Sequence, residues 1–219
     1  MKRVLSLLMC LLMVLSLFTA CAKKDDDVIK IGVFEPLTGE NGGGGQQELD
    51  GINYANKMYP EVSGKKIELV VVDNKSDKGE ATTAVTRLIE KDKVVAIIGS
   101  YGSGVSIAAG DIIKNAKIPA MGASCTNPMV TEGNEFYFRA CFLDPFQGRV
   151  MANYAIEQGA KTAAVIMQNG DDYSVGLGNF FINAFKELTG DADSIVDISE
   201  FQVNDSDFNA ILTNIKAKN

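Results

Sequence analysis

The sequence predicts an α/β fold in which parallel sheets are covered by helices. From residue 28 onward, short runs rich in Val and Ile alternate with longer stretches whose apolar residues recur every three or four positions. The short runs are typical of buried strands, and the longer stretches have the period of amphipathic helices. Strands that alternate with helices in this way usually form parallel sheets.

Six apolar runs are expected to be strands, because each is short and is bounded by charged or turn-forming residues. In chain order they cover residues 28–34, 66–73, 94–99, 117–122, 163–167 and 194–201.

Three helices are expected between the first strands, at about residues 46–58, 79–91 and 104–115. The second should begin after Asp77, which is followed three residues later by Glu80 in the pattern of a capping box. Each helix has an apolar face at helical spacing. The faces consist of Leu49, Ile52 and Ala55, then Ala84, Val85, Leu88 and Ile89, then Val105, Ala108, Ala109 and Ile112.

The pattern changes at residues 136–148, which have no clear period and contain Pro145. We interpret this segment as a crossing between two lobes, an N-terminal lobe over residues 28–141 and a second lobe over residues 142–219. The second lobe has too few strands for a well-protected sheet. We therefore expect it to be incomplete and the chain to be truncated at its C-terminus.

Two helices of the second lobe are clear from their apolar spacing. One covers residues 174–188 and should end at Gly190, and the other covers about residues 206–217. Their inward residues are Leu177, Phe180, Phe181, Ala184, Phe185 and Leu188, then Phe208, Ile211, Leu212 and Ile215.

Residues 1–20 have a basic start, a short apolar run and small residues at the end, as a secretory signal peptide does. The apolar run is short for a membrane span, which needs about 20 residues. Thr19 and Ala20 before Cys21 resemble a bacterial lipobox, in which Cys21 would carry the lipid and residues 21–27 would be a polar tether. An ordinary signal peptide that happens to contain a cysteine is the alternative. We expect an extracytoplasmic protein that is anchored to the bacterial cell membrane by an N-terminal lipid.

The composition excludes several classes of function. The 28 acidic residues outnumber the 21 basic ones and give a net charge of −7, which disfavours nucleic acid as a partner. The chain has no histidine, so Ser-His-Asp and Cys-His catalysis and imidazole-based zinc sites are excluded. Asp171 and Asp172 are adjacent acids, but neighbours in a loop need not share a proton. We expect no enzyme, no cofactor and no metal.

Two cysteines, Cys125 and Cys141, remain once the signal peptide and Cys21 are set aside. They could form a disulfide in an oxidising compartment, or they could be free small apolar residues. The sequence leaves both options open.

The stretch GSYGSGVS at residues 99–106 follows an expected strand and opens an expected helix. It is not a phosphate loop, because Val105 stands where lysine is needed, and it is not a dinucleotide fingerprint, because Ile107 stands where glycine is needed. Ser103 falls at the expected N-cap, where its hydroxyl and the free amides could bind a carboxylate. A tight turn with Ser103 as a plain cap is the alternative.

A second polar segment, ASCTNP, follows the next expected strand and contains Ser124 and Thr126. Ligands of parallel sheets bind beyond the carboxyl ends of the strands, so these two strand ends could form one polar cup. A turn without any ligand is the alternative.

These stretches together resemble the substrate-binding lipoproteins of ABC importers for branched-chain amino acids, which have the type I periplasmic-binding-protein fold of two Rossmann-like lobes. The resemblance covers essentially all of residues 28–219. The matching motifs are IGVFEPLTG (31–39), VVAIIGSYGSGVS (94–106), IPAMGASCTNP (118–128), EFYFRACFLDPFQG (135–148), DDYSVGLGNFF (171–181) and DSDFNAILTNIK (205–216).

The resemblance implies specific ligand contacts. Ser103 matches the serine that binds the α-carboxylate of the ligand, and the segment Ser124, Cys125 and Thr126 matches the one that holds the carboxylate and the ammonium. Tyr173 matches an aromatic residue that the second lobe brings over the ligand, and Tyr101 lies where a side-chain contact is common. In one departure, Gly44 falls where some members have an aromatic contact, which puts the preference for Leu, Ile or Val in doubt. The acidic partner of the ammonium would lie beyond residue 219.

We therefore expect a protein that captures an amino acid or a similar small ligand between two lobes and delivers it to a membrane permease. The alternative is a binding domain that senses a small amide or carboxylate for a signalling receptor.

Overall fold

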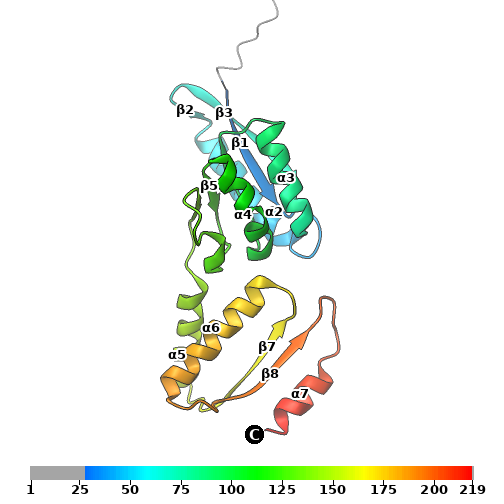
Figure 1. The fold of residues 1–219 in the computed structure, drawn as a ribbon, viewed down its shortest axis with the longest axis vertical. Helices are drawn as coiled ribbons and strands as arrows, with labels where there is room; N and C mark the ends of the chain where they lie inside the picture. The colour runs from blue at the N-terminus through cyan, green and yellow to red at the C-terminus, as the bar shows by residue number, and fades with distance from the viewer. Residues whose placement is uncertain (1–27, 219) are drawn as a thin grey trace, which may run out of the picture.

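The computed structural model describes residues 28–218, and the expected signal peptide, lipidated Cys21 and tether lie outside the described residues. The described chain forms two units joined by the segment after residue 139 (Figure 1). The large unit, residues 28–139, contains a six-stranded sheet, and the small unit, residues 144–218, contains a two-stranded sheet. The α/β fold class is thus confirmed.

The six-stranded sheet has the strand order β2-β3-β1-β4-β5-β6, and all neighbouring strands are parallel except β2 and β3. The longest pairing joins β1 and β3 along eight residues, from Val28 opposite Lys66 to Glu35 opposite Asp73. The strands are β1 (Val28–Glu35), β2 (Glu61–Val62), β3 (Lys65–Asp73), β4 (Ala96–Ile98), β5 (Ala120–Gly122) and β6 (Tyr137–Arg139).

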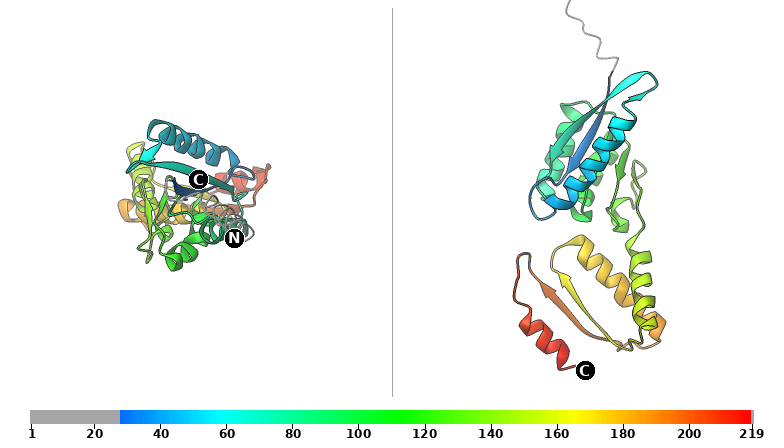
Figure 2. Two further views of the ribbon diagram at one scale, coloured as in Figure 1. Left: turned by 90° about the horizontal axis from the view of Figure 1, so that it is seen from above. Right: turned by 180° about the vertical axis from the view of Figure 1, so that it is seen from behind.

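Helices cover both faces of this sheet. The helices α3 (Lys78–Glu90) and α4 (Ser103–Ala116) lie side by side on one face, and α2 (Gly42–Met58) lies on the other (Figures 1 and 2). The main core lies between the sheet and α3 and α4, and Phe34, Leu88 and Ile97 are among its fully buried members.

The small unit is built around two parallel strands and has a much smaller core. The helix α5 (Asp144–Glu157) packs against α6 (Asp172–Thr189), and β7 (Ala163–Gln168) pairs with β8 (Ile195–Phe201). The final helix, α7 (Asn209–Lys216), has no buried residue. A Cβ atom on Gly148 would come within 2.7 Å of the α6 backbone, so this glycine allows α5 and α6 to approach closely.

All six predicted strands and all five predicted helices are present, with shifted ends. The prediction was wrong at the glycine run, because α2 begins at Gly42 and not at Gln46. Glycine weakens a helix, but a side chain at Gly45 would collide with Pro36. Gly45 therefore allows α2 to lie close to the chain after β1.

The crossing segment is more regular than its sequence indicates. It contains β6, which was not predicted, and the start of α5, whose bounds were not predicted. A three-residue strand is too short to have a period. Pro145 is tolerated because the first turn of a helix needs no amide donor.

Candidate ligand-binding cleft

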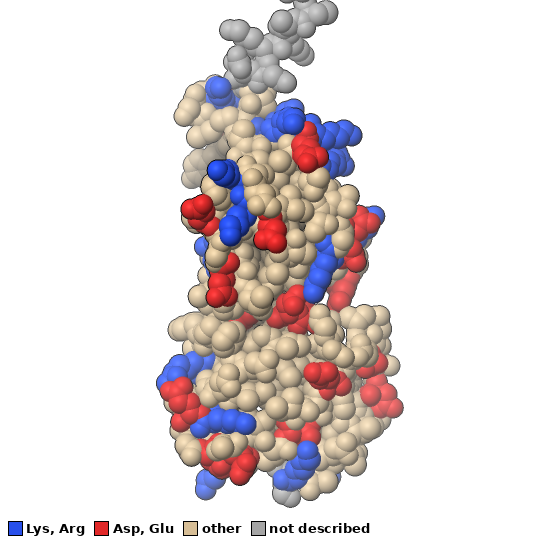
Figure 3. Space-filling view, in the orientation of Figure 1, with Lys and Arg blue, Asp and Glu red and all other residues tan. Residues whose placement is uncertain are grey.

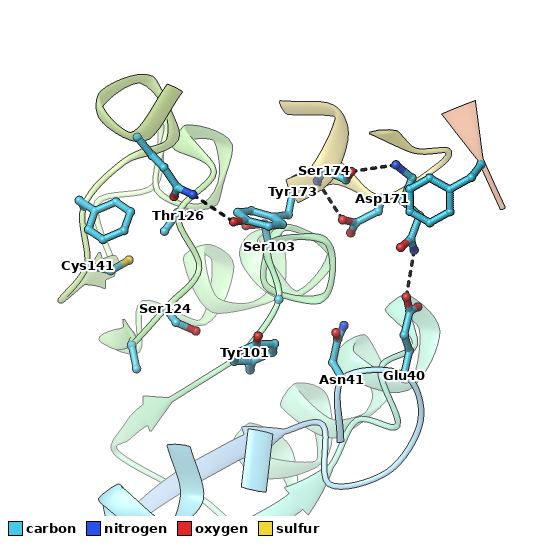
Figure 4. A pocket seen from close by; sticks show the side chains of 16 residues that line it. Glu40, Asn41, Tyr101, Ser103, Ser124, Thr126, Cys141, Asp171, Tyr173 and Ser174 are labelled. Carbon is cyan, nitrogen blue, oxygen red and sulfur yellow. Dashed lines mark hydrogen bonds between the residues drawn. The ribbon is translucent and has the colours of Figure 1, made fainter. Parts of the chain in front are cut away.

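The main cavity lies where the two units face each other, at the carboxyl ends of β4, β5, β7 and β8. Its volume is about 700 Å³. Figure 4 shows that both units contribute side chains to it. The lining residues are Glu40, Asn41, Tyr101, Gly102, Ser103, Ala123, Ser124, Thr126, Cys141, Phe142, Gln147, Gln168, Asp171, Tyr173, Ser174 and Phe201.

Five of the six predicted ligand contacts line this cavity. They are Tyr101, Ser103, Ser124, Thr126 and Tyr173, and the topology brings them together from three separate segments. Cys125 is the exception. Its side chain is fully buried behind the wall, and its carbonyl accepts a hydrogen bond from Arg139 Nη1 at 2.9 Å.

Ser103 lies at the start of α4, but its predicted role as N-cap is wrong by one residue. The N-cap is Gly102, whose φ of 94° favours glycine, and Ser103 is the first helical residue. The Ser103 Oγ atom is buried and accepts a hydrogen bond from the Asn127 amide at 3.2 Å. Its own hydroxyl hydrogen therefore stays available for an acceptor in the cleft.

Thr126 brings a second hydroxyl group to the cleft. Its Oγ1 atom is buried and forms no hydrogen bond of normal geometry among the described residues, although it lies near enough to Asp144 to lower the pKa of that acid. A buried hydroxyl without a partner is unfavourable, so a polar ligand group at this point would stabilise it. Ser124 differs, because its hydroxyl already donates to Glu48.

Arg139 fixes the shape of the loop that carries Ser124 and Thr126. Its Nη1 atom donates to the carbonyls of Cys125 and Asn127, at 2.9 and 2.8 Å. Its Nη2 atom donates to the Pro128 carbonyl and to Thr131 Oγ1, at 3.1 and 2.6 Å. The unpredicted strand β6 thus holds the loop after β5 in place.

Aromatic rings form the less polar part of the cleft. The Tyr101 ring lies over Gly44, where a Cβ atom would come within 2.5 Å of it. The hydroxyl of Tyr173 accepts a hydrogen bond from Gln147 Nε2 at 3.3 Å. Phe142 and Phe201 complete the aromatic lining.

Polar contacts cross directly from one unit to the other. Lys78 forms an ion pair with Asp172, with 2.7 Å between Nζ and Oδ2. Asn127 Nδ2 donates to the backbone carbonyl of Asp172 at 2.9 Å. Gln168 Nε2 donates to Glu40 Oε1 at 3.1 Å, a contact marked in Figure 4. The two units are therefore held in a facing arrangement.

Two buried acids next to the cleft were not predicted. Asp144, at the start of α5, is fully buried, and neither carboxylate oxygen has a hydrogen-bond partner among the described residues. Burial raises the pKa of Asp144, although the nearby Thr126 hydroxyl and Arg139 partly lower it. Glu35, at the end of β1, is also fully buried. An acidic residue directly after the uncharged run IGVF is the signal in the sequence that could have identified Glu35.

Both described cysteines are free, so the open question of a disulfide is answered for this structure. Burial raises the pKa of Cys125 to about 11 and also raises the pKa of Cys141. Both thiols are therefore protonated at neutral pH.

Within residues 28–218 there is no group of three Cys, Asp or Glu residues placed to hold a metal ion. In the same range, no helix is both long and apolar enough to cross a membrane.

The face of the molecule drawn in Figure 3 carries both signs of charge. Figure 3 shows acidic and basic side chains interspersed over the visible face of both units, with no continuous basic area.

The family model described as periplasmic binding protein matches residues 28–219. An amino acid binding protein of Pseudomonas aeruginosa is 31% identical over 195 residues, which are 87% of this chain and 51% of that protein. Leu/Ile/Val-binding protein homolog 3 of Brucella melitensis is 28% identical over 86% of this chain and 51% of its own length. The chain thus spans about half the length of these relatives.

Solved structures agree in fold. A leucine-binding protein LivK from Thermotoga maritima superposes with a TM-score of 0.80 and 41% identity, over 87% of this chain and 53% of that one. The substrate-binding protein LivJ of Streptococcus pneumoniae, solved with isoleucine, has a TM-score of 0.78 and 32% identity over 88% of this chain and 55% of its own. A solute-binding protein of Rhodopseudomonas palustris, solved with 3,4-dihydroxybenzoic acid, has a TM-score of 0.76 and 26% identity over 88% and 52%. The chain belongs to the periplasmic binding protein family and is similar to its branched-chain amino acid members.

Proposed function

We propose that this protein is the extracytoplasmic solute-binding component of an ABC importer and captures an amino acid, branched-chain or related, between its two units. The observation that carries the proposal is that two hydroxyl-bearing residues, Ser103 and Thr126, line one cavity at the strand ends. Such groups and the free amides at the start of α4 suit a carboxylate. The aromatic side chains suit an apolar body attached to it.

The ligands of two relatives fit this division of the cleft. Isoleucine and 3,4-dihydroxybenzoic acid, which are bound in the LivJ and Rhodopseudomonas structures, join a carboxylate to an aliphatic and to an aromatic group, respectively. We infer that the carboxylate is the part of the ligand that Ser103 recognises. The lobes predicted at residues 28–141 and 142–219 would then close on the ligand and present a distinct shape to the permease.

Calorimetry tests the ligand class directly. The panel is leucine, isoleucine, valine, phenylalanine and benzoate, added to the longest natural form of the protein. Ser103→Ala should weaken binding of the preferred ligand by about 1 kcal/mol or more, or at least about fivefold, because a hydrogen bond to a charged group is worth about 1.5–3 kcal/mol. Ser206→Ala is the matched control, since Ser206 is exposed and does not line the cavity. No heat with any compound in the panel would contradict the proposed ligand class.

The lipid anchor at Cys21 and delivery to a permease stay predictions. Growth with a labelled fatty acid should label the wild-type protein and leave Cys21→Ser unlabelled. Cross-linking in cells should recover an ABC permease, whereas recovery of a signalling receptor would favour the sensing alternative.

A further inference from the structure

Two acidic side chains meet behind the wall of the cleft, outside the set of lining residues. Glu35 is the last residue of β1 and is 0% exposed. Its Oε2 atom accepts a hydrogen bond from the Tyr101 amide at 2.7 Å. Its other oxygen, Oε1, is buried and has no hydrogen-bond partner among the described residues. One half of this carboxyl group therefore holds the loop after β4, and the other half is unsatisfied.

Glu48 approaches from α2 with the same division of its two oxygens. Its Oε1 atom accepts the hydroxyl hydrogen of Ser124, in the loop after β5. Its Oε2 atom is buried and has no hydrogen-bond partner among the described residues. The two carboxyl groups are close enough to interact, and burial followed by the charge of Glu48 raises the pKa of Glu35 to about 9.

Within residues 28–218, neither Glu35 nor Glu48 forms an ion pair with a basic side chain. The ionisable group that acts on Glu35 is Glu48. Glu35 in turn acts on Tyr137 of β6, and Glu48 acts on Cys141. Two ionised carboxylates whose oxygens are buried would repel each other, because no positive charge lies between them. A single proton between them removes the repulsion and gives each orphan oxygen a partner.

We propose that Glu35 and Glu48 share one proton and that this carboxyl pair positions the ligand-binding loops by holding the Tyr101 amide and the Ser124 hydroxyl. The pair connects four segments, namely the ends of β1, β4 and β5 and the second turn of α2. Both glutamates are positioning residues, since neither lines the cleft. Loss of the shared proton would separate the pair and release the two loops.

Infrared spectroscopy tests the shared proton without any ligand. The wild-type protein at neutral pH should show the C=O stretch of a protonated carboxyl group that resists exchange with solvent. Glu35→Gln should remove this band, because the glutamine amide cannot carry the carboxyl proton. Glu48→Gln should lower the pH at which the band disappears by about one unit or more, because a neighbouring negative charge is removed.

Glu61→Gln is the matched control, since Glu61 is exposed on β2. It should leave the band unchanged. Asp144 is a second buried acid with a raised pKa, so the diagnostic signal is the difference between the wild-type and Glu35→Gln spectra. A neutral-pH difference spectrum with no protonated-carboxyl band would overturn the proposal. A deprotonation pH that Glu48→Gln does not change would overturn it as well.

Ligand affinity tests the positioning role, and this step rests on the proposed function. Gln at position 35 can accept from the Tyr101 amide and donate to Glu48, so it imitates the protonated pair at every pH. Affinity of the wild type should therefore fall relative to Glu35→Gln by about threefold or more between pH 7 and pH 10. The ligand ammonium titrates in the same range in both proteins, so only their ratio is diagnostic. A constant ratio would refute positioning, whereas no binding by either protein would refute the proposed function and leave the infrared result to decide the pair.

Discussion

Replacing Arg139 should destabilise the protein more than its half-buried position indicates. The side chain donates to three backbone carbonyls and one hydroxyl. Lysine has a single ammonium group and cannot reach four acceptors in a planar fork, so Arg139→Lys should lose at least two of these bonds. At about 1.5–3 kcal/mol for each hydrogen bond to a charged group, the loss is about 3–6 kcal/mol. Water can reach a half-buried site, so we expect the lower end, about 3 kcal/mol.

Urea unfolding measures this change, and Arg149→Lys is the matched control. Arg149 also forms a paired contact, with Glu187, but both side chains are at least half exposed. We expect no measurable change in the free energy of unfolding for the control. Arg139→Lys should also weaken ligand binding, because the loop that it holds carries Thr126. If both lysine variants unfolded at the same urea concentration, the loop would not depend on the guanidinium group.

Three further results are expected. Gly44→Ala should destabilise the protein by about 1–3 kcal/mol, because the new methyl group collides with the Tyr101 ring. Gly43→Ala, whose methyl group meets no atom within 4 Å, should stabilise the protein by about 0.5 kcal/mol. Thermal unfolding of the two variants measures the difference. Lys78→Met removes the ion pair across the two units and should weaken ligand binding by less than about fivefold, an effect that high salt should abolish, since the pair is exposed. For Glu35, whose pKa is raised from 4.5 to about 9, the unfolded state loses its proton first, so stability should fall as pH rises between these values. Relative to Glu35→Gln, urea unfolding should show wild-type stability decreasing by up to about 4 kcal/mol from pH 5 to pH 8, at about 1.4 kcal/mol for each pH unit, and an increase would refute the assignment.

The regular elements could be predicted because their sequence signals are local. The helix start at Asp77 is an example. Its side chain accepts from the Glu80 amide at 2.8 Å, as the spacing of the two residues indicates. The end of α6 at Gly190, with φ of 66°, is another. The strand β6 could not be predicted in this way, because its three residues are specified by pairing with β5 and not by their own pattern.

The cleft could be predicted in outline but not in its support. Residues that follow a strand, such as Ser103 and Thr126, are placed by the topology of parallel sheets. Arg139 and Asp144 lie in a segment that was interpreted only as a crossing, and their importance comes from atoms that lie far from them in the sequence. Contacts of this kind have no periodic signal, so a single sequence does not reveal them.

The interpretation of Gly44 illustrates why one position cannot define a binding site. Its small size predicted a missing aromatic wall and a changed preference for the ligand. In the structure the space above Gly44 is filled by the Tyr101 ring, which lines the cleft from a loop more than 50 residues away. A side chain at position 44 and the ring of Tyr101 cannot occupy the same space. The glycine at position 44 therefore makes room for the Tyr101 ring, and it does not mean that the cleft lacks an aromatic wall. Ligand preference should therefore depend on Gly44 and Tyr101 together. Tyr101→Ala should enlarge the cleft, whereas Gly44→Ala should displace the Tyr101 ring.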